Sequence, residues 1–594
     1  MSAEIPRPGG GDFLTSVSRW EDVFVPEEFA TEHRMIGDSL EKFIAREVEP
    51  LGDAGEKPDY QLTRRILEKA GEAGILGACL PEQYGGLGLN GVRFALIKEK
   101  LNNGSSSIVT AIGGQIGIGM LPIVFFGTDE QRRKYLPGLT AGTLTTAFAL
   151  TEPWAGTDAS AIRMSARLSD DGTYYTLNGT KVFITNAGFA DIFVVFAKID
   201  RKEFSAFIVE RGSEGVTIGP EEQKMGLKGS STCSLTFDDV RVPAGNLLGR
   251  PGHGHLFAFN VLNFGRLSVG AGCLGNAKEA LECSVKYANQ RVQFGRPISG
   301  FPLIAKKIAE MNVRAYVLES MVYRTAALMD LGLGELDFSD PDLGEKSRRA
   351  VGEYMVECAV NKVFGSETLG FVADEGLQIH GGYGYMKEFR IEGIYRDARI
   401  KRIFEGTNEI NRLFIANTLA RKVLKGRAEA LRQAIEAARG GFEPELSEVP
   451  PEGTSEGDAC RVRLAKRLFL LSFGAALEKY GARLEEEQEV CSDLGDMVID
   501  VFAMESASLR ARKILELKGG RGAEASRSMT TIFLQEALGR IGSLARGLAR
   551  VVGDRDGFAE RLSSLDPWRL CAADTVALKR QLAARVIEAE RYVC

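Results

Sequence analysis

The chain has 594 residues, of which 44% are hydrophobic and 26% are charged, and its formal net charge is −6. This composition is ordinary for a soluble globular protein, and the length predicts roughly three or four domains. No basic tract dominates, which argues against a nucleic-acid-binding protein. No apolar run is expected to be long enough to span a membrane. Nine scattered cysteines without a C-x-x-C pair indicate reduced, buried thiols, and the four histidines argue against a metal site.

The first quarter of the chain turns helical after an irregular start. Residues 1–27 are expected to form an irregular N-terminal arm that lies over the surface. Residues 28–143 predict an N-terminal α-helical domain, because apolar residues such as Leu40, Phe43 and Val48 recur at helical spacing. The N-terminus has neither the apolar segment of a signal peptide nor the composition of a transit peptide, so a cytoplasmic location is expected.

The period changes from helical to alternating near Thr143. Short β-rich runs, several of them separated by Asp-Gly, Asn-Gly and Asn-Ala-Gly turns, then predict a small β-barrel or sandwich over residues 144–252. Strands are expected at residues 145–150, 164–168, 174–177, 181–185, 192–196, 204–209 and 233–237.

The rest of the chain is predicted to be helical again. Residues 253–425 are expected to form a four-helix bundle domain. Residues 426–457 are expected to be a linker, because their second half is rich in glycine, proline, serine and glutamate. Residues 458–594 predict roughly four more helices. The fold class is therefore α+β multidomain, with an N-terminal helical domain, a central β-barrel, a helical bundle and an extra C-terminal α-helical domain. Bundle helices are expected at residues 257–289, 303–331 and 347–371.

Residues Gly270–Gly275 match the dinucleotide-binding pattern G-x-G-x-x-G. No strand is predicted before them, and no acidic residue occurs between Glu282 and Glu310, where that pattern needs one. Small residues for close helix packing are therefore the favoured interpretation.

Residues Arg402–Ile410 place a carboxylate, Glu405, between Phe404 and Gly406. Desolvation by neighbouring apolar groups would raise the pKa of this glutamate and make it a better base near neutral pH. Gly406 would let a ligand approach the backbone closely, and Thr407 is expected to cap the following helix. An ordinary helix-entry loop with a solvated glutamate explains the same residues, so local sequence leaves both interpretations open.

Other motifs accompany this stretch, and each alone is explained by a turn, a strand or a helix cap. They are Thr-Glu-Pro-x-Ala-Gly-x-Asp at 151–158, Ile-Thr-Asn at 184–186, Arg-x-x-Phe-Gly at 291–295 and Gln-x-x-Gly-Gly at 378–382. Together with Phe-Glu-Gly-Thr at 404–407, and in this order, they resemble the acyl-CoA dehydrogenase family of flavoenzymes. The resemblance covers about residues 28–425. The region after residue 457, with Asp566-Pro-Trp568 near its end, resembles the very-long-chain branch of the family.

This resemblance implies that the protein converts acyl-CoA thioesters with long or very long chains to trans-2-enoyl-CoA, the first step of fatty-acid β-oxidation. FAD is the implied cofactor: Glu405 removes the α-proton as catalytic base, and N5 of FAD accepts the β-hydrogen as hydride. The backbone N–H of Glu405 and a ribityl hydroxyl of FAD would stabilise the charge on the thioester oxygen. The implied partners are an electron-transferring flavoprotein as electron acceptor and a second subunit in a homodimer.

The resemblance also assigns binding residues. The FAD contacts that it implies are Phe148, Leu150, Thr151, Thr157, Phe183, Ile184, Thr185, Arg291, Phe294, Gln378, Gly381, Gly382, Thr407 and Glu409. Those from Arg291 to Gly382 would hold the ADP part of a neighbouring subunit's FAD. The implied substrate contacts are Thr157, Asn263, Phe264, Gly265, Arg266 and Gly406. Some members carry the base near position 265, and a glycine there leaves Glu405 without a rival.

Two residues depart from the family pattern. Phe183 stands where the family usually has a tryptophan against the flavin, and Trp154 replaces a small residue.

Two other functions stay open: an acyl-CoA oxidase that uses oxygen, and a non-catalytic assembly factor of a membrane complex, which the retention of Glu405 disfavours. Residues 460–474 are basic and then apolar. They are expected either to lie on the inner membrane face or to form a buried bundle helix.

Overall fold

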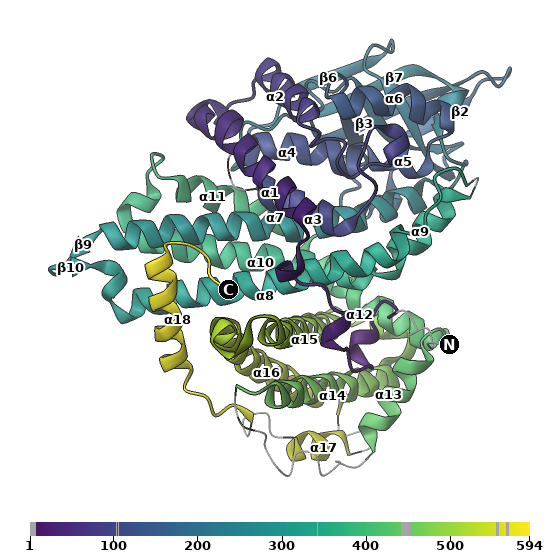
Figure 1. The fold of residues 1–594 in the computed structure, drawn as a ribbon. Coiled ribbons are helices and arrows are strands. Elements are labelled where there is room, and N and C mark those ends of the chain that lie inside the picture. Colours follow the sequence, from purple (N-terminus) through teal and green to yellow (C-terminus); the bar gives the residue numbers. More distant parts are fainter. Residues whose placement is uncertain are drawn as a thin grey trace. The chain divides into compact units, whose positions relative to one another are not determined.

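The chain divides into two compact units, which are described separately (Figure 1). The first unit comprises Met1–Phe29, Val269–Leu328 and Tyr354–Cys594, and the second comprises Ala30–Ser268 and Met329–Glu353. The computed structural model describes residues 8–102, 104, 106–340, 342–440, 451, 453–553, 557–565 and 570–594.

Helices open the second unit, as the apolar spacing predicts. Polar side chains fix where several of them begin: Asp59 accepts a hydrogen bond from the backbone N–H of Leu62, and Asn90 accepts one from that of Arg93. The helices are α1 (Thr31–Phe43), α2 (Tyr60–Glu72), α3 (Gly91–Leu101), α4 (Ser106–Gly114), α5 (Leu121–Phe126), α6 (Asp129–Ala141) and, later in the chain, α9 (Leu343–Glu353).

The stretch Ser106–Phe126, which contains α4 and α5, corrects one expectation. It is long and apolar enough to cross a membrane by length and composition, with a mean hydropathy of 1.9. In this unit, however, 78% of its most apolar window is buried. Phe125 of this stretch packs on Phe264, with ring centroids 5.8 Å apart, and Phe264 also meets Phe94 at 5.5 Å. The stretch is therefore a core segment of the unit.

The predicted barrel or sandwich is one eight-stranded sheet in the second unit. The strand order is β6-β7-β3-β2-β4-β5-β8, and β1 pairs with β4 in parallel. A single cluster of apolar side chains, including Phe193, Phe207 and Leu235, lies against the sheet. The strands are β1 (Thr146–Ala149), β2 (Ser165–Leu168), β3 (Tyr174–Thr185), β4 (Ile192–Ile199), β5 (Glu203–Glu210), β6 (Val216–Glu221), β7 (Thr232–Pro243) and β8 (Leu247–Leu248).

Two details of this sheet differ from the prediction. The Asn178-Gly179 pair, expected as a turn, is instead an irregularity inside the long strand β3, where the register against β7 shifts. Gly179 is required there because an added Cβ would lie 2.9 Å from Met164. Strand β6 was not expected, because it is an edge strand that contains Gly219 and Pro220 and buries few side chains.

Long helices form the first unit, and two of them, α7 (Gly254–Gln290) and α8 (Pro302–Leu333), also belong to the second unit at one end. Gly270 lies inside a helix and not after a strand, and a Cβ on Gly365 would lie 3.0 Å from its Cα. This close helix crossing confirms the packing interpretation of the glycine motif. The predicted helix at 347–371 is two helices, which separate at Tyr354. The helices are α7 (Gly254–Gln290), α8 (Pro302–Leu333), α10 (Met355–His380), α11 (Arg390–Ala398), α12 (Asn408–Leu424), α13 (Glu429–Arg439), α14 (Ser455–Tyr480), α15 (Gln488–Gly522), α16 (Glu524–Val552), α17 (Phe558–Ser564) and α18 (Thr575–Ala589).

The C-terminal helices bear on two expectations, the structure of residues 460–474 and the extent of the linker. Helices α14, α15 and α16 pack on one another (Figure 1), and the apolar side chains of α14, such as Leu468 and Phe473, are buried. Residues 460–474 therefore form a bundle helix, and their apolar face is not available to a bilayer. The linker expected from residue 426 contains α13, which buries Leu431 and Ile435. Residues 441–450 and 566–568 lie outside the described residues.

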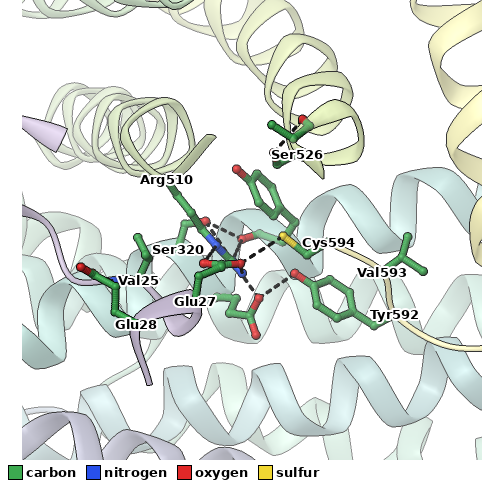
Figure 2. A network of polar contacts seen from close by, with 12 residues as sticks. Val25, Glu27, Glu28, Ser320, Arg510, Ser526, Tyr592, Val593 and Cys594 are labelled. Atoms are coloured by element: carbon green, nitrogen blue, oxygen red, sulfur yellow. Dashed lines mark hydrogen bonds and ion pairs between the residues drawn. The ribbon is translucent and has the colours of Figure 1, made fainter. Parts of the chain in front are cut away.

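Residues 8–27 of the N-terminal arm, the part that the structure describes, are packed into the first unit and do not lie over its surface as expected. Phe13, Leu14 and Val25 are buried, which explains why this short segment is held in place. Figure 2 shows how Glu27, at the end of the arm, joins a polar network around Arg510 of α15. Arg510 contacts Glu27 at 2.8 Å and Glu319 of α8 at 2.7 Å.

Candidate active site

Glu405 lies in a loop with an unusual backbone just before α12. Its φ angle is 55° and that of Gly406 is 81°, so two successive residues are left-handed. A non-glycine residue rarely adopts this conformation, and it marks functional positions when the surroundings enforce it. Thr407 then caps α12 by accepting the backbone N–H of Ile410 at 3.3 Å, which confirms the predicted cap. The Glu405 side chain is half-buried at the start of this turn.

Two buried side chains enforce the loop, and sequence reasoning missed both. The amide of Asn411 donates to the carbonyl oxygens of Gly406 at 2.8 Å and Thr407 at 3.0 Å, and more distantly to that of Glu405 at 3.4 Å. The ammonium of Lys362 donates to Gly406 O at 2.6 Å. Both side chains have 0% exposure. The one sequence signal was a lysine inside an apolar run of α10.

Gly406 has a structural role besides the room for substrate that the sequence predicts. A Cβ added at this position would lie 3.1 Å from the amide nitrogen of Asn411. Because the residue also has a positive φ angle, glycine is favoured on two counts. Glu409, an expected FAD contact, lies exposed on the first turn of α12. Its own backbone N–H lowers its pKa, so the side chain carries a negative charge there.

The residues expected around the flavin ring gather on β1, β3 and the loop after β1, in the second unit. Phe183 has a φ angle of 59° and holds its ring 65% exposed. Thr157 is exposed, and Phe148, Thr151 and Thr185 are half-buried. The side chains of Leu150 and Ile184 are buried, and Ile184 belongs to the apolar cluster of the sheet. These two residues therefore have only their backbone to offer a ligand.

A buried ion pair that sequence reasoning missed holds the loop after β1. Lys181 of β3 contacts Glu152 at 2.8 Å and the carbonyl oxygen of Leu150 at 3.0 Å, and both charged side chains have 0% exposure. Burial lowers the pKa of Lys181 to about 8, against the opposing influence of Glu152. Glu152 also accepts the backbone N–H groups of Arg163 and Met164 at 2.6 and 3.0 Å.

Trp154, the second departure from the family pattern, is fixed by the same carboxylate. Its indole N–H donates to Glu152 at 2.9 Å, and its ring is 52% exposed. The guanidinium of Arg163 lies 5.2 Å from the ring centroid. The structure therefore presents an oriented, exposed aromatic side chain next to the loop that Lys181 holds.

A cavity of about 470 Å³ in the first unit brings together Arg291, Gly381 and Gly382, three of the residues expected to bind the ADP part of FAD. The Arg291 guanidinium lies 5.5 Å from the Tyr383 ring, and a Cβ on either glycine would meet nothing within 4 Å. A cation, aromatic rings and open backbone suit a nucleotide diphosphate, so these residues fit FAD. Gln378 and Phe294 do not line the cavity. Sequence reasoning missed Tyr287, Gln293, Ile298, Ile379, His380, Tyr383 and Met386.

The residues expected near the CoA moiety lie on α7 in the second unit, and they are largely buried. Phe264 is 1% exposed between Phe94 and Phe125, so its side chain packs in the core and only its backbone could meet a ligand. Asn263 accepts a hydrogen bond from Arg266 at 3.0 Å.

Three comparisons with known proteins agree with this architecture. Sequence models of the N-terminal, middle and C-terminal domains of acyl-CoA dehydrogenase match residues 30–143, 147–240 and 252–420, and another C-terminal domain model of the same family matches residues 464–565. A probable acyl-CoA dehydrogenase of Bacillus subtilis is 44% identical over 584 residues, which cover 98% of each chain. The human mitochondrial very long-chain specific acyl-CoA dehydrogenase is 35% identical over 571 residues, which cover 90% of this chain and 82% of that protein.

A solved structure extends the likeness to three dimensions. The crystal structure of acyl-CoA dehydrogenase complexed with FAD from Bacillus anthracis has a TM-score of 0.94 and 44% identity, and the match covers 99% of this chain and 100% of that one. The fold and the matches define an oxidoreductase. The chain belongs to the acyl-CoA dehydrogenase family, which confirms the resemblance and the predicted succession of domains.

Proposed function

We propose that the protein is an FAD-dependent dehydrogenase of long- or very-long-chain acyl-CoA thioesters, with Glu405 as the base that removes the α-proton. The observation that carries this proposal is the backbone of Glu405, whose left-handed conformation is held by Asn411 and Lys362. Such a constraint fixes the Glu405 carboxylate at a defined place, in a loop where Gly406 leaves room for a ligand.

Different residues of the chain would remove the proton, stabilise the negative charge and bind FAD. Glu405 takes the α-proton, and its backbone N–H is the donor proposed for the thioester oxygen, where negative charge develops. Bound FAD would supply the acceptor for the hydrogen and the electrons that leave the β-carbon, so that trans-2-enoyl-CoA forms. Arg291, Gly381 and Gly382 would bind the ADP part of the FAD of a neighbouring subunit. Phe183 would cover the ring system of the FAD bound to its own subunit.

The long-chain assignment rests on the human very long-chain specific relative. Its match covers 90% of this chain and therefore extends into the extra C-terminal helices. A panel of substrates from butyryl- to stearoyl-CoA, followed by bleaching of the flavin, tests it. We expect faster bleaching with palmitoyl-CoA than with butyryl-CoA. Oxygen consumption without another acceptor would instead indicate an oxidase, and we propose an electron-transferring flavoprotein as the acceptor.

The proposed base is tested with Glu405→Gln. We expect this variant to retain FAD and to lose bleaching by substrate, because the amide cannot accept the proton. Glu429→Gln, on the exposed face of α13, is the control and should bleach like the wild type. Normal bleaching in Glu405→Gln would refute the assignment.

We also propose a homodimer. β9 (Val292–Gln293) and β10 (Arg296–Pro297) form a hairpin (Figure 1). Phe294, between the two strands, is 93% exposed. An apolar side chain presented in this way suits a contact with a second copy that places the ring on the neighbouring FAD site. Sedimentation velocity of the wild type and Phe294→Ala tests this, and a wild type that stays monomeric at micromolar concentration would contradict it.

A further inference from the structure

A chain of charged and polar contacts links the C-terminal helical domain to the loop of Glu405. Asp496 of α15 pairs with Arg412 of α12 at 2.7 Å. Arg412 also pairs with Glu367 of α10 at 2.8 Å. All these side chains belong to the first unit.

The contacts continue from Glu367 to the loop itself. Asn408, the first residue of α12, donates to Glu367 at 3.1 Å and accepts from Lys362 at 2.8 Å. Lys362 then reaches the carbonyl oxygen of Gly406 at 2.6 Å. Arg412 has a side-chain exposure of only 14%, whereas Glu367 and Asp496 expose 34% and 35% of theirs, so solvent screens the two pairs in part. Although burial disfavours its charge, Asp496 and Glu367 raise the pKa of Arg412.

The backbones of the two helices are in direct contact at the same place. A Cβ added to Gly495 would lie 2.8 Å from the carbonyl oxygen of Arg412. Helix α15 can approach α12 this closely only because residue 495 has no side chain. Asp496, the next residue, is therefore held at a fixed distance from Arg412.

We propose that α15 is a positioning element for the catalytic base. The Asp496–Arg412 pair, acting through Glu367 and Asn408, holds Lys362 against the Gly406 carbonyl group and so sets the direction of the Glu405 carboxylate. Asp496, Arg412 and Lys362 are positioning residues that do not touch the reacting atoms. This inference rests on the proposed role of Glu405, and it gives the C-terminal domain a part in the reaction.

The test compares two variants on one helix. Asp496→Asn removes the charge that holds Arg412. Asp500→Asn, one turn further along α15, removes the partner of Arg540, a pair of equal length at 2.7 Å. The Asp500 side chain interacts electrostatically with Asp496, but its hydrogen bonds go to Arg540 and not to the contacts that lead to the loop. Both variants are made in the full-length holoenzyme and mixed with palmitoyl-CoA, and the rate constant of flavin bleaching is measured with normal and α-deuterated substrate.

We expect Asp496→Asn to bleach about tenfold more slowly, because a base displaced by a fraction of an ångström loses its alignment. The α-deuterium isotope effect should rise, and the substrate concentration at half-maximal rate should stay unchanged. Asp500→Asn should match the wild type in all three measurements. A normal rate in Asp496→Asn, or equal losses in both variants, would overturn the inference.

A second measurement does not depend on turnover. Hydrogen exchange of the backbone amides from Phe404 to Asn408 should accelerate in Asp496→Asn and not in Asp500→Asn. Unchanged exchange in both variants would overturn the proposed linkage. Failure of the proposed function would show itself differently, as a wild type that no acyl-CoA bleaches.

Discussion

Asn411 donates its side-chain amide to the carbonyl oxygen of Gly406 at 2.8 Å, and a methyl group at residue 406 would lie 3.1 Å from the same nitrogen. The loop of Glu405 and the first turn of α12 are thus fitted to each other. The amide approaches the loop closely only because residue 406 is a glycine.

Gly406→Ala should therefore slow flavin bleaching by about tenfold or more, since both the φ angle and the Asn411 contact oppose it. Gly426→Ala is the matched control, because Gly426 also has a positive φ angle of 65° but has nothing within 4 Å of an added Cβ. Stopped-flow bleaching and thermal unfolding of both variants separate strain from loss of alignment. Equal rate losses would contradict a specific role for the Asn411 contact.

Lys181→Met should destabilise the sheet domain by about 3–5 kcal/mol, because it leaves the carboxylate of Glu152 buried without its cation. The double variant Lys181→Met/Glu152→Gln should recover part of this loss. Urea unfolding followed by intrinsic fluorescence measures both. The control is Lys134→Met, which breaks an exposed pair with Glu210 at 2.8 Å and should cost less than about 1 kcal/mol. A loss of that small size in Lys181→Met would contradict the prediction.

Glu357 predicts a stability that depends on pH. It is 1% exposed on α10 and accepts the backbone N–H of Gly11 at 2.7 Å. Burial raises its pKa from 4.5 to about 7. The folded state therefore keeps a proton that the unfolded chain loses, so this contribution to stability is present below pH 4.5 and is lost as the pH rises through 7.

Glu357→Gln keeps the acceptor oxygen and never ionises. The free energy of unfolding of this variant, relative to that of the wild type, should increase between pH 5 and pH 8 by at most about 3 kcal/mol. Thermal unfolding at both pH values measures the difference. A difference that stays constant with pH would mean that the carboxyl group titrates normally.

Phe183→Ala should weaken FAD binding with little effect on the fold. The ring is 65% exposed, so its loss costs the apoprotein little, whereas lost stacking against the flavin should lower affinity by up to roughly tenfold. Flavin fluorescence during dilution gives the affinity. Leu168→Ala, at a 41% exposed position of β2, is the control and should retain FAD as the wild type does.

Periodicity predicted the layout of this chain well, because each domain repeats one pattern over many residues. The switch from helical to alternating spacing near Thr143 coincides with the start of the sheet at Thr146. The failures have local causes. The Asn178-Gly179 pair has the composition of a turn but sits in a continuous strand, since only the packing of Met164 reveals that the glycine is there for space.

The same contrast between local patterns and long-range packing separates the predicted residues of the candidate site from the missed ones. Glu405, Gly406 and Thr407 were predicted because one short motif holds them. Lys362 lies 44 residues before the Gly406 carbonyl that it binds, and Lys181 lies 29 residues after Glu152. Such pairs leave no local pattern, because folding alone brings the partners together. A lysine among apolar residues was the visible sign for Lys362, whereas Lys181 follows Asn178-Gly179-Thr180 and had no such sign.

The complete burial of Lys181 and Glu152 also separates the ion pair that holds the loop after β1 from the surrounding medium. Dissolved ions screen pairs that they can approach, and they cannot enter a site with 0% exposure. Ionic strength should therefore loosen the exposed pair of Lys134 and Glu210 and leave the buried pair unaffected. The geometry of this loop should be the same in dilute buffer and in concentrated salt.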